Sequence, residues 1–454
     1  MDDTAGRFVD HALGTEWDAL SHSAQRAARI FLHDSVAVGI AGRNAMLADA
    51  AFAAAQGWSG RGGTGMVLGR PGARLTVPHA AFVNAYQIHA QEYDCVHEPA
   101  VAHPMASVGA VLLAEASRAP LTGSDFLAAM VAGVDLVGAL GVAVKGPLKF
   151  FRPATAGIFG SIAAISRARR LTPEVTRNAL GYGLAFASGT MQAHVEGKPA
   201  LAVQVAAAAR SAIEAVDLAR AGFEGPQASM EGPFGYLSLF ENDVDLPPVL
   251  DALSRVRRIE ELSWKPFPTG RAAHGAIVAL RELIAEQGVT VATLERFTYS
   301  APPLIHRLVG RRPYVGMSVA YARLCLAWLA ALVLTRGTVD LADFTPANLS
   351  DPDLLALAEK IVVVADDNPD VAAFVPAVGV AKLKDGAEHK VTVMKQFGSP
   401  EWPLSHDEHM TKARRCLEFG GMAHIHLELA ALIERLDQEA DVAAAFVGLM
   451  ELES

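Results

Sequence analysis

Alanine-rich segments with the apolar spacing of helices fill most of the first half of this 454-residue chain. The clearest of them are 23–41, 46–56, 79–92, 104–117, 124–144, 158–169, 173–188 and 200–221. Ala is the best helix former and allows helices to pack closely. Since 51% of the residues are hydrophobic, the chain has enough apolar surface to fold. We therefore expect a large, mostly helical protein.

The pattern changes after Trp264. Apolar and polar residues alternate as in strands over 292–300, 377–384 and 387–394, and a fourth strand is expected at 360–365. The dipeptide Asp385-Gly386 is typical of a hairpin turn. Helical patterns occur among these strands at 271–287 and 315–335, and they return after the last strand at 406–437 and 440–450.

This alternation predicts a mainly α fold with two domains. Both ends of the chain, 1–264 and 405–454, are expected to form a large all-helical domain. A smaller α+β domain, 265–404, is expected to be inserted between them.

Charge and composition exclude several classes of protein. The formal net charge of −10 argues against a nucleic-acid partner. The apolar stretches 126–144 and 319–334 approach the length of a membrane span, but each carries a charged residue. We interpret them as buried helices and expect no membrane partner. The N-terminus lacks the features of a signal peptide, and the three cysteines have no CxxC spacing. We therefore expect a cytoplasmic protein without an iron–sulfur cluster.

One short motif suggests a cofactor and is better interpreted as a turn. Gly60-Arg61-Gly62-Gly63-Thr64-Gly65 fits GxGxxG, but dinucleotide binding needs a strand before this motif and a helix directly after it. Here a helical pattern precedes the motif and a strand-like pattern follows it. We expect no nucleotide cofactor.

A cluster of histidines and acids lies between two predicted helices. It contains His89, Glu92, Asp94, His97 and His103. Asp94 could fix the tautomer of His97 or His103 and leave the other ring nitrogen free for proton transfer. We interpret Asp94 and His103 as functional, and His89, on a helix face, as a core histidine.

A metal site is the competing interpretation of this cluster, since Cys95 lies within it as well. The spacing fits no compact zinc pattern, and no second ligand cluster is evident, so we expect no metal.

The segment WKPFPTGRAAH gathers cations at the start of a predicted helix. Its two prolines and Gly270 favour a rigid turn. A helix N-terminus with Lys265, Arg271 and His274 is suited to binding carboxylates. Arg152, His194 and Lys198 are weaker candidates, because each alone is more typical of a surface charge.

Four segments in this order resemble the MmgE/PrpD family: NAYQIHAQEYDCVHEPAVAHP, FRPATAGIFG, SMEGPFGYLSLF and KPFPTGRAAHGAI. Members of that family dehydrate, decarboxylate or epimerise small carboxylic acids such as 2-methylcitrate, cis-aconitate and iminodisuccinate. The resemblance implies a large helical domain, a smaller α+β lid, an active site between them, no cofactor and a homodimer. It also implies that Asp94, His103 and His274 belong to the active site.

Two family motifs differ here. A GxHPT-like stretch is replaced by Phe150-Phe151-Arg152-Pro153, without a histidine. A KRLH-like run is replaced by Leu201-Ala202-Val203-Gln204, with Lys198 three positions earlier. Arg152 and Lys198 are therefore candidates to supply the missing charge.

The leading hypothesis is a cofactor-independent, dehydratase-like lyase that removes a proton α to a carboxylate of a small di- or tricarboxylic acid. His103 would be the base, oriented by Asp94, and His274 the proton donor. The expected substrate-binding residues are Lys265, Arg271, His97, Arg152 and Lys198. An epimerase or isomerase, a decarboxylase, or a catalytically silent carboxylate-binding relative are the alternatives.

Overall fold

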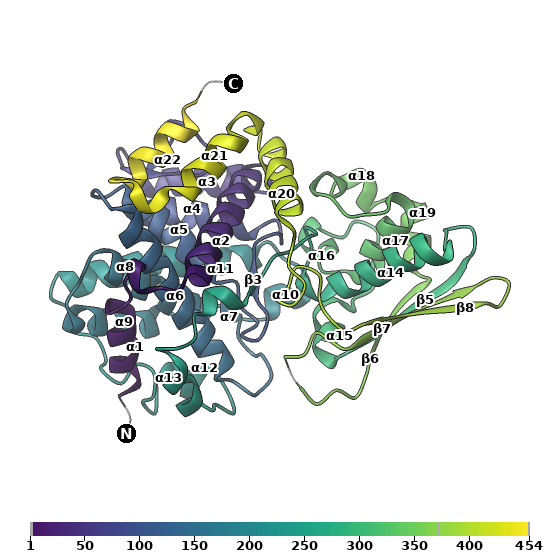
Figure 1. Cartoon of the computed structure of the whole chain (residues 1–454), viewed down its shortest axis with the longest axis horizontal. Coiled ribbons are helices and arrows are strands. Elements are labelled where there is room, and N and C mark those ends of the chain that lie inside the picture. The colour runs from purple at the N-terminus through teal and green to yellow at the C-terminus, as the bar shows by residue number, and fades with distance from the viewer. Residues whose placement is uncertain (1–2, 371, 453–454) are drawn as a thin grey trace.

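The computed structural model describes residues 3–370 and 372–452, and the chain is mainly α. Helices of the first half cluster together at the left of Figure 1. The longer ones are α1 (Thr4–Leu13), α2 (His22–Ala41), α3 (Ala48–Ser59), α4 (Val77–His89), α5 (Pro104–Ala116), α6 (Gly123–Val142), α8 (Gly157–Ala168), α9 (Pro173–Phe186) and α11 (Ala200–Arg220). Short helices α7 (Arg152–Thr155), α10 (Gln192–Glu196), α12 (Tyr236–Phe240) and α13 (Pro247–Ala252) connect them.

Local sequence explains where these helices begin. Ser21, Thr122 and Thr172 cap α2, α6 and α9 by accepting a backbone N–H with their side-chain hydroxyl. α5 is buried along its whole length, and α6 over nearly all of it. α4 and α8 pack against α5, and α6 packs against α8. These helices form the core.

α6 is the one described helix that by itself is long and apolar enough to cross a membrane. Of its most apolar window, 89% is buried inside the protein. α6 is therefore a buried core helix, as expected for an apolar stretch that carries a charged residue, Asp135.

A four-stranded sheet forms the second part of the molecule, at the right of Figure 1. The strands β5 (Leu294–Ala301), β6 (Ile361–Ala365), β7 (Ala377–Leu383) and β8 (Glu388–Val393) are arranged in the order β6-β5-β7-β8. β5 and β6 are parallel and the other pairs are antiparallel. The predicted hairpin between β7 and β8 is confirmed, and Gly386 takes φ 90°, which favours glycine.

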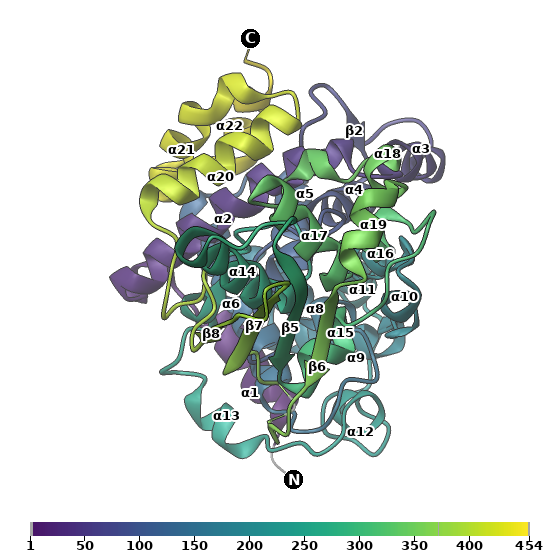
Figure 2. The ribbon, with the colours of Figure 1, turned by 90° about the vertical axis from the view of Figure 1, so that its right-hand side faces the viewer.

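Helices cover this sheet, which faces the viewer in Figure 2. α14 (His274–Gln287) packs on β7 and β8, and α15 (Pro303–Val309) and α17 (Leu326–Arg336) pack on β6. The remaining helices are α16 (Val319–Ala322), α18 (Pro346–Leu349) and α19 (Pro352–Ala358). The single helix predicted over 315–335 is wrong: Cys325, in an extended conformation, separates α16 from α17.

The C-terminal helices return to the first part of the chain. α20 (His406–Phe419) and α21 (His426–Glu434) pack against α2, and α22 (Val442–Met450) packs against α5 (Figure 1). The continuous helix predicted over 406–437 is interrupted at Gly421, where φ is 72°. The domain limits after 264 and 404 stay a prediction.

The sequence predicts an all-helical domain for the first part of the chain. Two small antiparallel ladders show that this part also contains short strands. β1 (Gly65–Met66) pairs with β2 (Arg74–Leu75), and β3 (Val96–His97) pairs with β4 (Leu262–Ser263). The GxGxxG motif leads into β1 rather than into a helix. The β3–β4 ladder brings the histidine-rich segment beside the KPFP segment, and this contact builds the candidate site.

Candidate active site

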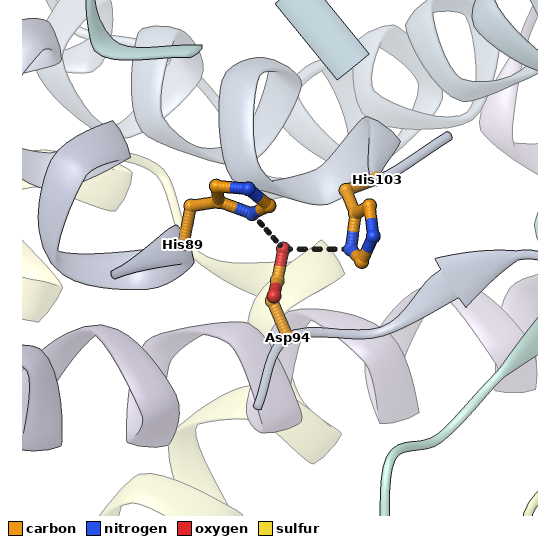
Figure 3. Close-up of side chains that lie close together, drawn as sticks. All are labelled: His89, Asp94 and His103. Atoms are coloured by element: carbon orange, nitrogen blue, oxygen red, sulfur yellow. Dashed lines mark hydrogen bonds and ion pairs between the residues drawn. The ribbon is translucent and has the colours of Figure 1, made fainter. Parts of the chain in front are cut away.

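Asp94 holds two histidines through one carboxylate oxygen. His89 is the last residue of α4, and His103 is the N-cap of α5. Asp94 Oδ2 lies 3.0 Å from His89 Nδ1 and 3.1 Å from His103 Nδ1 (Figure 3). The side chains of Asp94 and His89 are almost completely buried, and that of His103 is 14% exposed. We refer to His89, Asp94 and His103 as the Asp94 cluster.

Electrostatics keep Asp94 ionised within this cluster. Burial opposes ionisation, but His103, His89 and Lys265 together outweigh it and hold the Asp94 pKa well below its usual value. Burial, aided by Lys265, lowers the pKa of His103 despite the attraction of Asp94. His103 is therefore neutral near pH 7, with Nδ1–H directed to Asp94 and Nε2 available as a base.

A cavity of about 60 Å³ lies between the two parts of the molecule, and His103 lines it. Apolar side chains from both parts enclose it, including Phe151, Met191, Leu308 and Phe374. The titratable residues on its wall are Glu92, His103, Arg152, His194 and Arg271. The mixture of an apolar wall with a few converging polar groups is typical of a binding site for a small molecule.

Lys265 is completely buried beside the Asp94 cluster. Its Nζ donates to Glu92 Oε2 at 2.7 Å and lies 3.7 Å from Asp94 Oδ1. Lys265 thus contacts Glu92 and lies near Asp94, so its charge is already matched by two carboxylates, and it is not among the residues that line the cavity.

Arg271 lines the cavity, whereas His274 is not among the residues that line it. Arg271 Nη2 lies 2.7 Å from Glu98 Oε1, and its Nη1 donates to His274 Nδ1 at 3.2 Å. Because a guanidinium only donates, His274 accepts at Nδ1. Burial and the charge of Arg271 hold the pKa of His274 well below its usual value. His274 therefore lies behind Arg271 rather than on the wall of the cavity.

The three remaining predicted residues have different surroundings. Arg152 lines the cavity but makes a two-point ion pair with Glu241, at 2.9 and 3.0 Å. His97 does not line the cavity: its Nε2 lies 2.7 Å from Glu261 Oε2, and its Nδ1 accepts the Ala100 N–H. We interpret His97 as structural. Lys198 is exposed and borders a second, smaller cavity.

The Asp94 cluster is also the one described group of three side chains whose geometry could hold a metal ion, with ligand atoms within 4.8 Å of one another. A divalent ion there would be repelled by the Lys265 ammonium, which lies 3.7 Å from Asp94 Oδ1. It would also have to replace the Nδ1 protons of His89 and His103. Proton transfer is the simpler use of this arrangement.

Three site residues were missed or undervalued in the sequence. His89 was interpreted as a core histidine, yet it shares Asp94 with His103. Glu92 lay within the histidine-rich cluster but was given no role. His194 was considered a weak candidate, yet it is buried on the cavity wall, where burial and Arg311 lower its pKa to about 4.

Comparison with known proteins agrees with this fold and site. The MmgE/PrpD N-terminal domain matches residues 6–248, and the MmgE/PrpD C-terminal domain matches residues 267–437. A lyase-type enzyme is thus indicated, and the chain belongs to the MmgE/PrpD family.

Its relatives include two mammalian enzymes. Human cis-aconitate decarboxylase is 27% identical, over 77% of this chain and 74% of the relative. The mouse cis-aconitate decarboxylase is 28% identical, over 77% of this chain and 73% of the relative. A cis-aconitate decarboxylase-like protein, oryM of Aspergillus oryzae, is 27% identical over 86% of this chain and 85% of the relative.

Proposed function

We propose that the protein is a cofactor-independent lyase that acts on a small tricarboxylic acid of the cis-aconitate type by proton transfer at a carbon next to a carboxylate. The observation that carries this proposal is His103, held by Asp94 and lining a cavity beside Lys265 and Arg271. The names of the relatives support a tricarboxylate as substrate.

His103 would be the group that moves the proton. In a dehydration, neutral Nε2 takes the proton α to a carboxylate, the C–H electron pair forms the double bond, and the imidazolium gives this proton to the departing β-hydroxyl, which leaves as water. In a decarboxylation, the C–C bond to the departing carboxylate breaks, CO₂ leaves, and the electron pair stays on carbon as an enolate-like anion. His103 would then pass to that carbon a proton that its Nε2 has taken up from water. Asp94 stabilises the imidazolium in both cases.

The cations next to the cavity would stabilise the enolate-like intermediate that both reactions share. Charge develops on the substrate carboxylate when the carbanion forms, and pre-oriented cations in a dry site can lower the barrier by several kcal/mol. Lys265 lies 3.7 Å from Asp94 Oδ1, and Arg271 is held by Glu98, so both cations are oriented before the charge develops. Lys198 and Arg152 are the further candidates for contacts with distant carboxylates.

A single experiment separates the possible reactions. The protein is incubated in D₂O with cis-aconitate, citrate and 2-methylcitrate, and is followed by NMR with CO₂ detection. CO₂ release with deuterium on carbon indicates a decarboxylase, and formation of a new alkene with loss of water indicates a dehydratase. Exchange without net reaction indicates an epimerase. Binding without any exchange would contradict the proposal and favour a silent carboxylate-binding protein.

We also propose that residues 265–404 act as a lid over the site, and that the protein works as a homodimer in the cytoplasm. The position of the cavity between the helical part and the sheet part supports a lid. Size-exclusion chromatography with light scattering tests the dimer: a mass near 48 kDa, that of one chain, would contradict it.

A further inference from the structure

Three cations at or beside the cavity have a carboxylate partner within the chain. Lys265 pairs with Glu92, Arg271 with Glu98, and Arg152 with Glu241. A polycarboxylate substrate therefore meets compensated cations in the empty site. At least one of these ion pairs has to open before a substrate carboxylate can bind a cation directly.

Glu92 differs from the other two carboxylates in its position. It is the only one of the three that lines the 60 Å³ cavity. Its backbone has φ 49°, in the left-handed region that a residue other than glycine seldom adopts. Local strain of this kind is commonly retained where it serves a function. Glu92 is thus the carboxylate that a ligand in the cavity would meet first.

A second cavity lies on the other side of Glu92. It measures about 30 Å³, and Glu92 and Leu201 line both cavities. Lys198 and Arg323 also line the second cavity. Arg323 is 2% exposed, and its Nε has no hydrogen-bond partner among the described residues. The second cavity therefore offers positive charge to which the Glu92 carboxylate could move.

The size of the cavities also favours a rearrangement on binding. A cavity of roughly 150 Å³ holds benzene, with six heavy atoms, whereas the two cavities measure about 60 and 30 Å³ and together fall short of that volume. A tricarboxylate such as aconitate has twice as many heavy atoms as benzene, so side chains on the wall have to move before it binds. Movement of Glu92 away from Lys265 would supply part of that room and uncover the Lys265 ammonium.

We propose that Glu92 pairs with Lys265 only while the site is empty, and that a substrate carboxylate displaces it toward Lys198 and Arg323. Glu92 is then a specificity-determining residue. It occupies the place of a substrate carboxylate, and it leaves only for a ligand whose own carboxylate binds Lys265 at least as well. This inference rests on the proposed action of the enzyme on polycarboxylates.

The test measures binding of propane-1,2,3-tricarboxylate, an unreactive tricarboxylate, by calorimetry to the wild type, to Glu92→Gln and to Glu261→Gln. Glu261→Gln is the matched control, because it removes one carboxylate from an ion pair, with Arg258, whose two residues line neither cavity. We expect Glu92→Gln to bind about tenfold more tightly than the wild type, since the repulsion between two nearby carboxylates is removed. Glu261→Gln should bind no more tightly than the wild type.

Equal or weaker binding by Glu92→Gln would overturn the inference and assign Glu92 a supporting role for Lys265. Equal tightening in both variants would overturn it too, because the effect would then be one of total charge. Turnover in D₂O distinguishes the two proposals: a wild type that converts a tricarboxylate while Glu92→Gln binds no more tightly leaves the lyase function intact. If neither protein binds or converts any tricarboxylate, both proposals fail.

A crystal structure of the wild type with the same tricarboxylate gives a second test that does not depend on folding of the variant. We expect the ligand carboxylate at Lys265 Nζ, with Glu92 more than about 4 Å away, beyond the range of an ion pair. A bound ligand with the Glu92–Lys265 distance still at 2.7 Å would overturn the inference.

Discussion

Two histidine pairs lie in the helical part of the molecule, and they differ in what connects the rings. In the Asp94 cluster, a carboxylate oxygen lies between His89 and His103. In the second pair, His33 of α2 and His409 of α20 contact each other directly, with His33 Nδ1 2.8 Å from His409 Nε2. The first pair links α4 with the start of α5, and the second links α2 with α20.

The surroundings of the second pair fix its protons. Trp264 Nε1 donates to His409 Nδ1 at 3.1 Å, so His409 carries its proton on Nε2 and donates to His33. Burial lowers the pKa of His33 to about 4, and burial with the nearby His33 lowers that of His409 to about 3. Neither ring lines the cavity. This pair is a neutral structural link between α2 and α20.

The comparison shows what a carboxylate adds to a histidine. Asp94 accepts the Nδ1 proton of His103 and can stabilise a second proton on Nε2, whereas His409 offers His33 no charge. A buried histidine therefore becomes a proton-transfer group only when an anion and an open volume lie on its two sides.

Replacing His103 by Gln should have the largest effect, because it removes the proton-transfer group from the Asp94 cluster. We expect turnover to fall about 10³-fold, within the range typical of general acid–base catalysis, with the melting temperature nearly unchanged. Steady-state kinetics and thermal unfolding measure both. Activity within tenfold of the wild type would show that another group moves the proton.

Replacing Asp94 by Asn should make the Asp94 cluster resemble the neutral pair of His33 and His409. An amide keeps the shape but cannot stabilise an imidazolium, and it leaves Lys265 with one carboxylate fewer. We expect kcat to fall about 10²-fold, at the lower end of the range for general acid–base catalysis, with a smaller change in KM. A loss confined to KM would indicate that Asp94 acts only by holding Lys265.

Lowering the pH should reduce the contribution of ionised Glu92 to the free energy of unfolding. Burial opposes its ionisation, but Lys265, His89 and His103 lower its pKa to about 2, from 4.5. Because the unfolded chain binds the proton first, this contribution is present above pH 4.5 and is lost as the pH falls toward 2. It amounts to about 3 kcal/mol at most. Urea unfolding from pH 6 to pH 3 should show a smaller loss for Glu92→Gln than for the wild type.

Replacing His409 by Phe should have the smallest effect on catalysis. Trp264 and His33 each lose a hydrogen-bond partner, so we expect the free energy of unfolding to fall by about 2 kcal/mol. We expect kcat to change less than about threefold, because general acid–base groups act within hydrogen-bond reach of the substrate, and His409 does not line the cavity. Denaturant unfolding and kinetics check this prediction, and a large loss of kcat at unchanged stability would contradict it.

Much of the fold could be predicted because its cause is local. The core helices follow from their apolar spacing, and the hairpin at Asp385-Gly386 follows from its turn residues. Gly42 follows α2 in a right-handed conformation and begins a short 3-10 turn, so its backbone does not require glycine. Glycine is needed there for a long-range reason: a Cβ would collide with the backbone of Gln87 in α4. The breaks at Cys325 and Gly421 were not predicted, because apolar periodicity continues across them.

The site could be predicted only in part. The sequence suggested that Asp94 orients His97 or His103, because all three lie between two predicted helices, where a loop can bring such side chains together. It also singled out Lys265 and Arg271, from their place at a helix start. It did not reveal that Glu92 pairs with Lys265, or that Arg152 pairs with Glu241, since those partners come from other elements.

The sequence by itself determined the mainly helical class, the strands of the sheet, the family resemblance and the residues able to move a proton. Only the tertiary structure decided which charges are compensated, that Arg271 rather than His274 lines the cavity, and that Glu92 lies between two cavities. The physical reason is distance along the chain. A helix or a turn is set by neighbouring residues, whereas the Glu92–Lys265 pair joins residues 173 positions apart and exists only once the β3–β4 ladder and the core helices have packed.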